Sequence, residues 1–373
     1  VNKVNILINY PKSGESGPAF VLELAKGLKK NGQNIYAVLP RRIPNANEWS
    51  QEFTEENIYW LKSPESRNKI DKLIKLIFVD LIAIKLKFWH KIDVSIKPFY
   101  STLGPVLDKA INSRLKAAVC HDPILHSGAN ISKESYRKFY RENDDIFVLT
   151  KSFIPVVQRE FDFPEDRIHY FPHGRMNMYQ ITKEYSRIQS EYKKKYHLLF
   201  FGRIEKYKGL HILSDAYNRV VSQNSDIELT ILGSGKFDEY KDEYSHLPNV
   251  HVINRYIKDD EVGNYFALPN TIVVVPYVDA TQSGVIPIAF EFGTPVVASN
   301  QGGLREQLDD GRLGLLYDNN DPKELANKIL ELMDDEECYQ KECEKMLQYS
   351  SNLGWDNVAK QLLDNLKLSK EKK

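Results

Sequence analysis

The chain has 373 residues, enough for two domains that each have a hydrophobic core of their own. Its 51 basic and 51 acidic residues give a formal net charge of zero, which argues against a general nucleic-acid-binding protein. The cysteines, Cys120, Cys338 and Cys343, are odd in number and lack the spacing of a metal site. We therefore expect no disulfide framework, no secretory signal and a cytoplasmic protein.

Short apolar runs alternate with longer helical patterns along the whole chain. Continuous apolar runs between helices are typical of parallel strands that are covered on both faces. Two such series predict an α/β protein with two doubly wound, Rossmann-like domains. The predicted strands are 4–9, 35–39, 58–61, 94–96, 117–120, 146–149 and 168–171, followed by 198–201, 227–232, 250–253, 272–275, 296–298 and 314–316.

The polar stretch 175–195 is the predicted boundary between the domains. It separates an N-terminal domain, 1–180, from a C-terminal domain, 190–350. Helical patterns follow the last strand, at 322–333, 336–349 and 355–368.

A phosphate-binding motif is predicted in the second half. Residues 283–303 contain a polar turn, a short helix and an apolar strand, and the unpaired N–H groups at a helix start favour an anion. Arg203 and Lys208 follow the predicted strand 198–201, and both side chains suit phosphate oxygens. Alone, the two cations also fit a solvated basic loop. Together with the Ser283 turn they predict a diphosphate pocket.

The first half offers a glycine loop and a histidine after a strand. Gly14 and Gly17 lie in the loop 11–18, which lacks the spacing of a dinucleotide fingerprint and is weak evidence alone. His121 directly follows the strand 117–120, where ligands bind in open α/β sheets. His126 has the pattern of an ordinary loop residue. A metal on this histidine pair is disfavoured because Pro123 breaks the helix that it needs. No Asp-X-Asp pair occurs, so we expect no catalytic metal and no cofactor.

The segment 70–91 combines apolar residues at helical spacing with lysines at its end. The favoured interpretation is that its apolar face, which includes Ile77 and Leu81, packs on the N-terminal domain. The alternative is peripheral contact with an anionic membrane at the inner face of the cell.

The set of motifs resembles the family-4 retaining glycosyltransferases with the GT-B fold, glycosyl transferases group 1. The resemblance covers nearly all of 197–335 and is looser in the first half. The matching pieces are Phe201-Gly202-Arg203, Lys208-Gly209, Leu232-Gly233-Ser234-Gly235, Asn249-Val250, Arg255-Tyr256-Ile257, Gly293-Thr294-Pro295-Val296-Val297-Ala298, Gly302-Gly303 with Glu306, Gly314-Leu315-Leu316, His121 and Pro172-His173-Gly174.

The resemblance implies two Rossmann-like domains that face each other across a cleft, with the last helix, 354–370, packed back on the first domain. It implies transfer of a sugar from a UDP- or GDP-linked donor to a sugar, glycan or lipid-linked acceptor, with retention, in cell-surface polysaccharide or glycoconjugate synthesis. His121, Arg203 and Lys208 are the catalytic residues that it implies. The donor-binding residues are Gly14, Gly17, Gly202, Gly233, Ile257, Gln282, Ser283, Gly284, Val285 and Glu291.

One departure concerns two glutamates that the family often carries. Their places are occupied here by Ala280 and Ile288. Glu291 is the nearest substitute, although a structural or solvent-exposed role suits it better. The loss leaves two alternatives to an active transferase: a non-catalytic GT-B subunit that binds the acceptor, or another GT-B enzyme such as a sugar-nucleotide epimerase.

Overall fold

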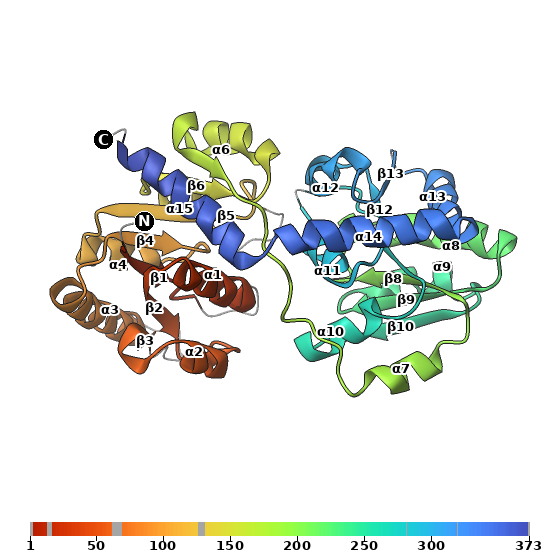
Figure 1. Cartoon of the computed structure of the whole chain (residues 1–373), viewed down its shortest axis with the longest axis horizontal. Coiled ribbons are helices and arrows are strands. Elements are labelled where there is room, and N and C mark those ends of the chain that lie inside the picture. The colour runs from red at the N-terminus through yellow and green to blue at the C-terminus, as the bar shows by residue number, and fades with distance from the viewer. Residues whose placement is uncertain are drawn as a thin grey trace. The chain divides into compact units, whose positions relative to one another are not determined.

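The computed structural model describes residues 3–12, 17–61, 69–125, 131–280, 282–318 and 320–371. The chain forms two compact units, and each contains one parallel sheet (Figure 1). Unit 1 comprises Val1–Gly174 and Gly354–Lys373, and unit 2 comprises Arg175–Leu353. The expected linker is therefore part of unit 2, where it contributes helix α7 (Tyr185–Glu191).

The sheet of unit 1 has the strand order β3-β2-β1-β4-β5-β6-β7, and all its neighbours are parallel. Every strand coincides with a predicted run. The strands are β1 (Asn5–Asn9), β2 (Asn34–Pro40), β3 (Ile58–Leu61), β4 (Val94–Lys97), β5 (Leu115–Cys120), β6 (Asp145–Val148) and β7 (Ile168–Tyr170). The helices are α1 (Pro18–Lys30), α2 (Ala46–Glu52), α3 (Lys69–Trp89), α4 (Gly104–Ile111), α5 (Lys133–Arg141), α6 (Ile154–Phe161) and α15 (Trp355–Glu371).

The sheet of unit 2 has the order β10-β9-β8-β11-β12-β13 and is also parallel. Its strands are β8 (Tyr196–Phe201), β9 (Ile227–Gly233), β10 (Val250–Asn254), β11 (Thr271–Val275), β12 (Val296–Ser299) and β13 (Leu315–Tyr317). Besides α7, its helices are α8 (Leu210–Gln223), α9 (Lys241–Tyr244), α10 (Asp259–Phe266), α11 (Val285–Phe292), α12 (Gly302–Gln307), α13 (Pro322–Asp334) and α14 (Glu336–Asn352).

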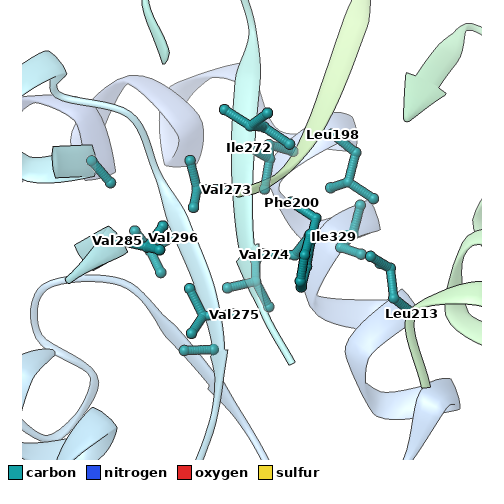
Figure 2. Packing of buried hydrophobic residues seen from close by; sticks show 14 of the residues in the cluster. Leu198, Phe200, Leu213, Ile272, Val273, Val274, Val275, Val285, Val296 and Ile329 are labelled. Atoms are coloured by element: carbon teal, nitrogen blue, oxygen red, sulfur yellow. The ribbon is translucent and has the colours of Figure 1, made fainter. Parts of the chain in front are cut away.

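Strand β11 shows why the central strands are continuous apolar runs. All five of its residues are buried, because helices cover both faces of the sheet. Figure 2 shows Val273 on the side of Val285 and Val274 on the side of Phe200 and Ile329. A polar residue on either face would therefore lie in the core.

The strand order reverses direction once in each sheet. In unit 1 this switch point lies between β1 and β4, and in unit 2 between β8 and β11. Connections leave the carboxyl ends of these strand pairs in opposite directions, so a crevice forms there and commonly binds ligand. The loops with Gly17, Arg203, Lys208 and Ser283 start at these ends, and His121 follows the neighbouring strand β5.

Two helices of unit 1 bear on the sequence analysis, α15 and α3. Helix α15 packs against α1 so closely that a Cβ atom on Gly27 would lie 2.1 Å from the Trp355 carbonyl oxygen. Helix α3 forms as predicted and packs on unit 1, but its predicted inward face is only partly right: Ile82 of that face is buried, whereas Ile77 and Leu81 are exposed. Among the described side chains of the helix, the other buried residues are Val79, Ala83 and Leu86. Within the described part of the chain, no helix is long and apolar enough to span a membrane.

Candidate functional site

The carboxyl ends of the central strands in unit 2 approach each other very closely. Gly233, at the end of β9, has a φ of 151°, and a Cβ atom there would lie 1.9 Å from the Gly202 carbonyl oxygen. Gly209 has a φ of 71°, and its Cβ would lie 1.8 Å from the Pro276 oxygen. Only glycine fits these positions, since a side chain would collide with backbone atoms. The glycines let the loop after β8 lie directly against the end of β11.

Lys208 is the most perturbed cation of this loop. Its Nζ atom lies 3.6 Å from the ring centroid of Tyr277 and 5.1 Å from that of Tyr207. Burial, and secondarily the charge of Arg203, lowers the pKa of Lys208 to about 7, against the opposing effect of Glu205. No carboxylate among the described residues forms an ion pair with Lys208. An arriving anion would stabilise its charged form.

Arg203 lies in the same loop, two residues after β8. Its side chain is exposed and forms no ion pair with a described residue. The structure thus holds two cations within six residues at the switch point, as the sequence predicted, and neither is neutralised by a described carboxylate.

Ser283 organises the turn before α11. Its N–H donates to Gln307 Oε1 at 2.7 Å, and Gln307 Nε2 donates to the Ser283 carbonyl oxygen at 3.0 Å. Its hydroxyl donates to the Tyr277 hydroxyl at 3.1 Å and accepts the Val285 N–H at 3.2 Å. Tyr277 therefore joins the Ser283 turn to Lys208.

The sequence predicted that the backbone N–H groups of this turn are unpaired, and these hydrogen bonds show that two of them are not. The N–H groups of Ser283 and Val285 are already used inside the protein, whereas that of Gly284 has no hydrogen bond to a described residue. Gly284 has an ordinary φ of −69°, and a Cβ atom there would meet nothing within 4 Å. A side chain at Gly284 would therefore meet neither backbone strain nor a steric clash within the protein. Gln282 directly precedes this turn, and Thr281 lies outside the described residues.

Glu291 does not face this turn. Arg175 donates to its carboxylate twice, from Nε at 2.8 Å and Nη2 at 2.7 Å, and Ser350 Oγ donates at 3.4 Å. The pair fixes Arg175 against α11, which gives Glu291 a role in packing. Ile288 is buried in the core of unit 2, and Ile257 is buried there as well.

His121 lies in unit 1, directly after β5. Its Nε2 lies 3.0 Å from the Pro98 carbonyl oxygen, and its ring stacks on Phe99 with 4.0 Å between centroids. Burial, the neighbouring His173 and Lys12 lower the pKa of His121 to about 3. The ring is therefore neutral at pH 7. Because a carbonyl only accepts, Nε2 carries the proton and Nδ1 is an acceptor.

The glycine loop and Lys12 lie near the same aromatic ring. A Cβ atom on Gly17, which has a φ of 105°, would lie 2.4 Å from the Phe99 ring. Lys12 Nζ lies 5.4 Å from the Phe99 centroid. Gly14 and His126 fall outside the described residues. In the part of the chain that is described, no three side chains form a metal-ligand group.

Sequence reasoning missed Tyr277, Gln307 and Lys12. Tyr277 lies two residues after β11, at the switch point of its sheet, and Lys12 lies three residues after β1. A search of every polar residue that follows a predicted strand would have found both. Gln307 has no such signal, because only the packing of α12 brings it to Ser283.

Comparisons with known proteins show what the chain is similar to. Residues 195–335 match the model of the family described as Glycosyl transferases group 1. Spore coat protein SA of Bacillus subtilis is 27% identical over 181 residues, 44% of this chain and 47% of the relative. A D-inositol 3-phosphate glycosyltransferase of Paenarthrobacter aurescens is 31% identical over 171 residues, 44% of this chain and 42% of the relative. The chain thus spans less than half the length of these curated relatives.

The fold extends beyond the matched segment. The structure of Anabaena HepE in complex with UDP and glucose is similar with a TM-score of 0.74 and 17% identity, covering 98% of this chain and 99% of that one. Two parallel-sheet α/β units and this likeness identify the fold as GT-B.

Proposed function

We propose that this protein is a retaining, metal-independent glycosyltransferase that moves a sugar from a nucleoside diphosphate to an acceptor hydroxyl. The observation that carries the proposal is the contact of Lys208 with Tyr277, which also binds Ser283. It joins a cationic loop to a helix start at one switch point, inside the segment that the family model matches. A diphosphate is the ligand that suits this combination.

The chemistry follows from where charge develops. As the bond between the anomeric carbon and the phosphate oxygen breaks, negative charge grows on the leaving diphosphate. Arg203, Lys208 and the Gly284 N–H would stabilise that charge. The acceptor oxygen bonds to the anomeric carbon on the same face, and its proton passes to the leaving phosphate oxygen. The products are a glycoside and a nucleoside diphosphate, and no protein base is required.

His121 would bind the donor sugar as a neutral ring. With its proton fixed on Nε2 by Pro98, it offers Nδ1 as an acceptor for a sugar hydroxyl.

UDP-glucose and GDP-mannose are the donors to test, UDP-glucose first because HepE was solved with UDP and with UDP-glucose. We expect a cytoplasmic protein that acts on a sugar, glycan or lipid-linked acceptor in cell-surface polysaccharide synthesis. Its three cysteines form no disulfide.

The test is release of nucleoside diphosphate and free sugar from each donor in the absence of acceptor. We expect slow hydrolysis with the anomeric configuration retained, and loss of hydrolysis in the Arg203→Ala, Lys208→Ala double variant. Binding of UDP without any hydrolysis or transfer would favour the non-catalytic subunit. A sugar epimerised while still linked to the nucleotide would replace the proposal with an epimerase.

A further inference from the structure

Helix α3 is apolar on two opposite faces. On one face Val79, Ala83 and Leu86 are fully buried against the sheet of unit 1, in a cluster with Leu7 and Val38. The opposite face presents a second row at spacings of four, three and four residues, which places its members on one side of the helix. This outer stripe comprises Ile77, Leu81, Ile84 and Phe88, which are 50, 52, 53 and 76% exposed.

A surface helix of a globular protein normally has one apolar face and one polar face. The outer stripe breaks that rule with four large side chains in a row. Trp89, at the end of α3, is 74% exposed and extends the apolar surface. Figure 1 shows α3 at the periphery of its unit, next to the edge strand β3. Contiguous exposed apolar surface of this kind marks a binding surface.

The charge around the outer stripe is positive. Lys85 and Lys87 are exposed and flank the stripe on opposite sides of the helix, and Lys91 follows. Asp80 is the acidic residue on the helix itself, and Glu55 and Glu56 lie in the adjoining groove. The sequence of α3 has five lysines and two aspartates, so its net charge is +3 in a chain whose net charge is zero. The charged residues are Lys69, Lys72, Lys75, Lys85, Lys87, Asp71 and Asp80.

A groove of about 720 Å³ continues the apolar surface toward β3. Leu81, Phe78 and Trp89 line it from α3, and Tyr59 and Trp60 line it from β3. Glu55 and Glu56, in the turn before β3, also line it. The outer stripe is thus the lysine-flanked edge of a wider apolar surface.

We propose that the outer stripe of α3 docks this protein on an anionic lipid bilayer, with the helix parallel to the membrane surface. A bilayer offers an apolar phase for Ile77, Ile84 and Phe88 and phosphate charge for the flanking lysines. A second copy of the chain fits less well, because an isologous contact would set the lysines of both copies side by side. The inference does not depend on the proposed function, since lipid binding is measured without transfer.

The experiment is sedimentation of the full chain with vesicles of phosphatidylcholine, pure or with about one third phosphatidylglycerol. We expect binding to the anionic vesicles, weaker binding to the neutral ones, and partial release by high salt. Lys85→Gln with Lys87→Gln lowers the partition coefficient about 25-fold, at about fivefold per lysine. Ile84→Ser with Phe88→Ser lowers it at least about tenfold, because both side chains leave the apolar phase.

Two matched double variants control for charge and exposed apolar area. Lys133→Gln with Lys138→Gln, and Ile124→Ser with Ile181→Ser, change exposed residues elsewhere and keep wild-type binding. Because all these residues are exposed, every variant keeps the wild-type melting temperature, which is measured in parallel.

The proposal is overturned if the wild type does not prefer anionic vesicles, or if the Ile84→Ser, Phe88→Ser variant binds them like the wild type. It is also overturned if the lipid-free wild type is a dimer in sedimentation velocity and this variant is a monomer. That last result would assign the outer stripe to a second copy.

Discussion

The burial of Lys208 makes its charged form depend on the charge of a nearby ligand. It is held over Tyr277 in a half-buried position where its charged form is costly, and Arg203 adds to that cost. A diphosphate would remove the cost. We expect Lys208→Ala to weaken UDP binding about 10- to 150-fold, the loss of a charge-assisted bond of about 1.5–3 kcal/mol. Isothermal titration calorimetry measures this, and Lys206→Ala, an exposed lysine of the same loop, is the control.

The pH dependence of UDP binding follows from the same shift. The free protein has a Lys208 pKa of about 7, and a bound diphosphate raises it, so binding takes up a proton above pH 7. The contribution of Lys208 to affinity is therefore flat below pH 7 and falls as pH rises above it, by up to about tenfold per pH unit. Calorimetry in buffers of different ionisation enthalpy detects the proton. Lys208→Arg keeps its charge throughout, and an unchanged pH profile in that variant would contradict the assignment.

A side chain at Gly284 would obstruct the proposed ligand without straining the backbone. Because its φ is ordinary and a Cβ atom there would meet no protein atom, Gly284→Val should fold with a melting temperature close to that of the wild type. Its side chain would occupy the space in front of the helix start, where the diphosphate is proposed. We expect at least tenfold weaker UDP binding, about 1.4 kcal/mol, with a smaller loss in Gly284→Ala. Normal UDP binding by Gly284→Val would remove the turn from the site.

At the scale of elements, helix α11 makes different contacts at its start and near its end. Its start carries the Ser283 turn, whereas Glu291 near its end holds Arg175 and contacts Ser350 of α14. These contacts attach the first residue of unit 2 to its core. The same short helix thus carries the turn where we propose ligand binding and fixes the chain where it enters the unit.

Glu291→Gln tests this division. The substitution removes the ionic partner of Arg175, which is itself partly exposed, so we expect a loss of about 1 kcal/mol in the free energy of unfolding. Urea denaturation measures it, with Glu344→Gln, an exposed residue of α14, as the control. UDP affinity of the folded protein should not change. Weaker UDP binding at unchanged stability would restore Glu291 to the donor site.

At the scale of the whole molecule, charge neutralisation by side chains replaces a metal in the proposed reaction. The sequence has no Asp-X-Asp pair, and Arg203 and Lys208 supply positive charge at the switch point of unit 2. We expect transfer to continue at an unchanged rate in excess EDTA. Loss of transfer that Mg²⁺ or Mn²⁺ restores would show that the two cations are insufficient.

The sequence by itself determined the strands of both sheets and the loops that follow them. Buried parallel strands need continuous apolar runs such as 272–275, and loops after such strands must start at the carboxyl edge. Arg203, Lys208 and Ser283 could therefore be placed from local pattern alone.

Only the tertiary structure decided which polar groups pair across the fold. Arg175 binds Glu291 from 116 residues away, and Gln307 takes the N–H of Ser283 that was expected to face a ligand. The tertiary structure also decided which face of α3 is exposed. Both faces of this helix are apolar, and periodicity alone cannot say which one the sheet covers. Local patterns fix the period of an element, whereas the partner of each side chain depends on how distant elements pack.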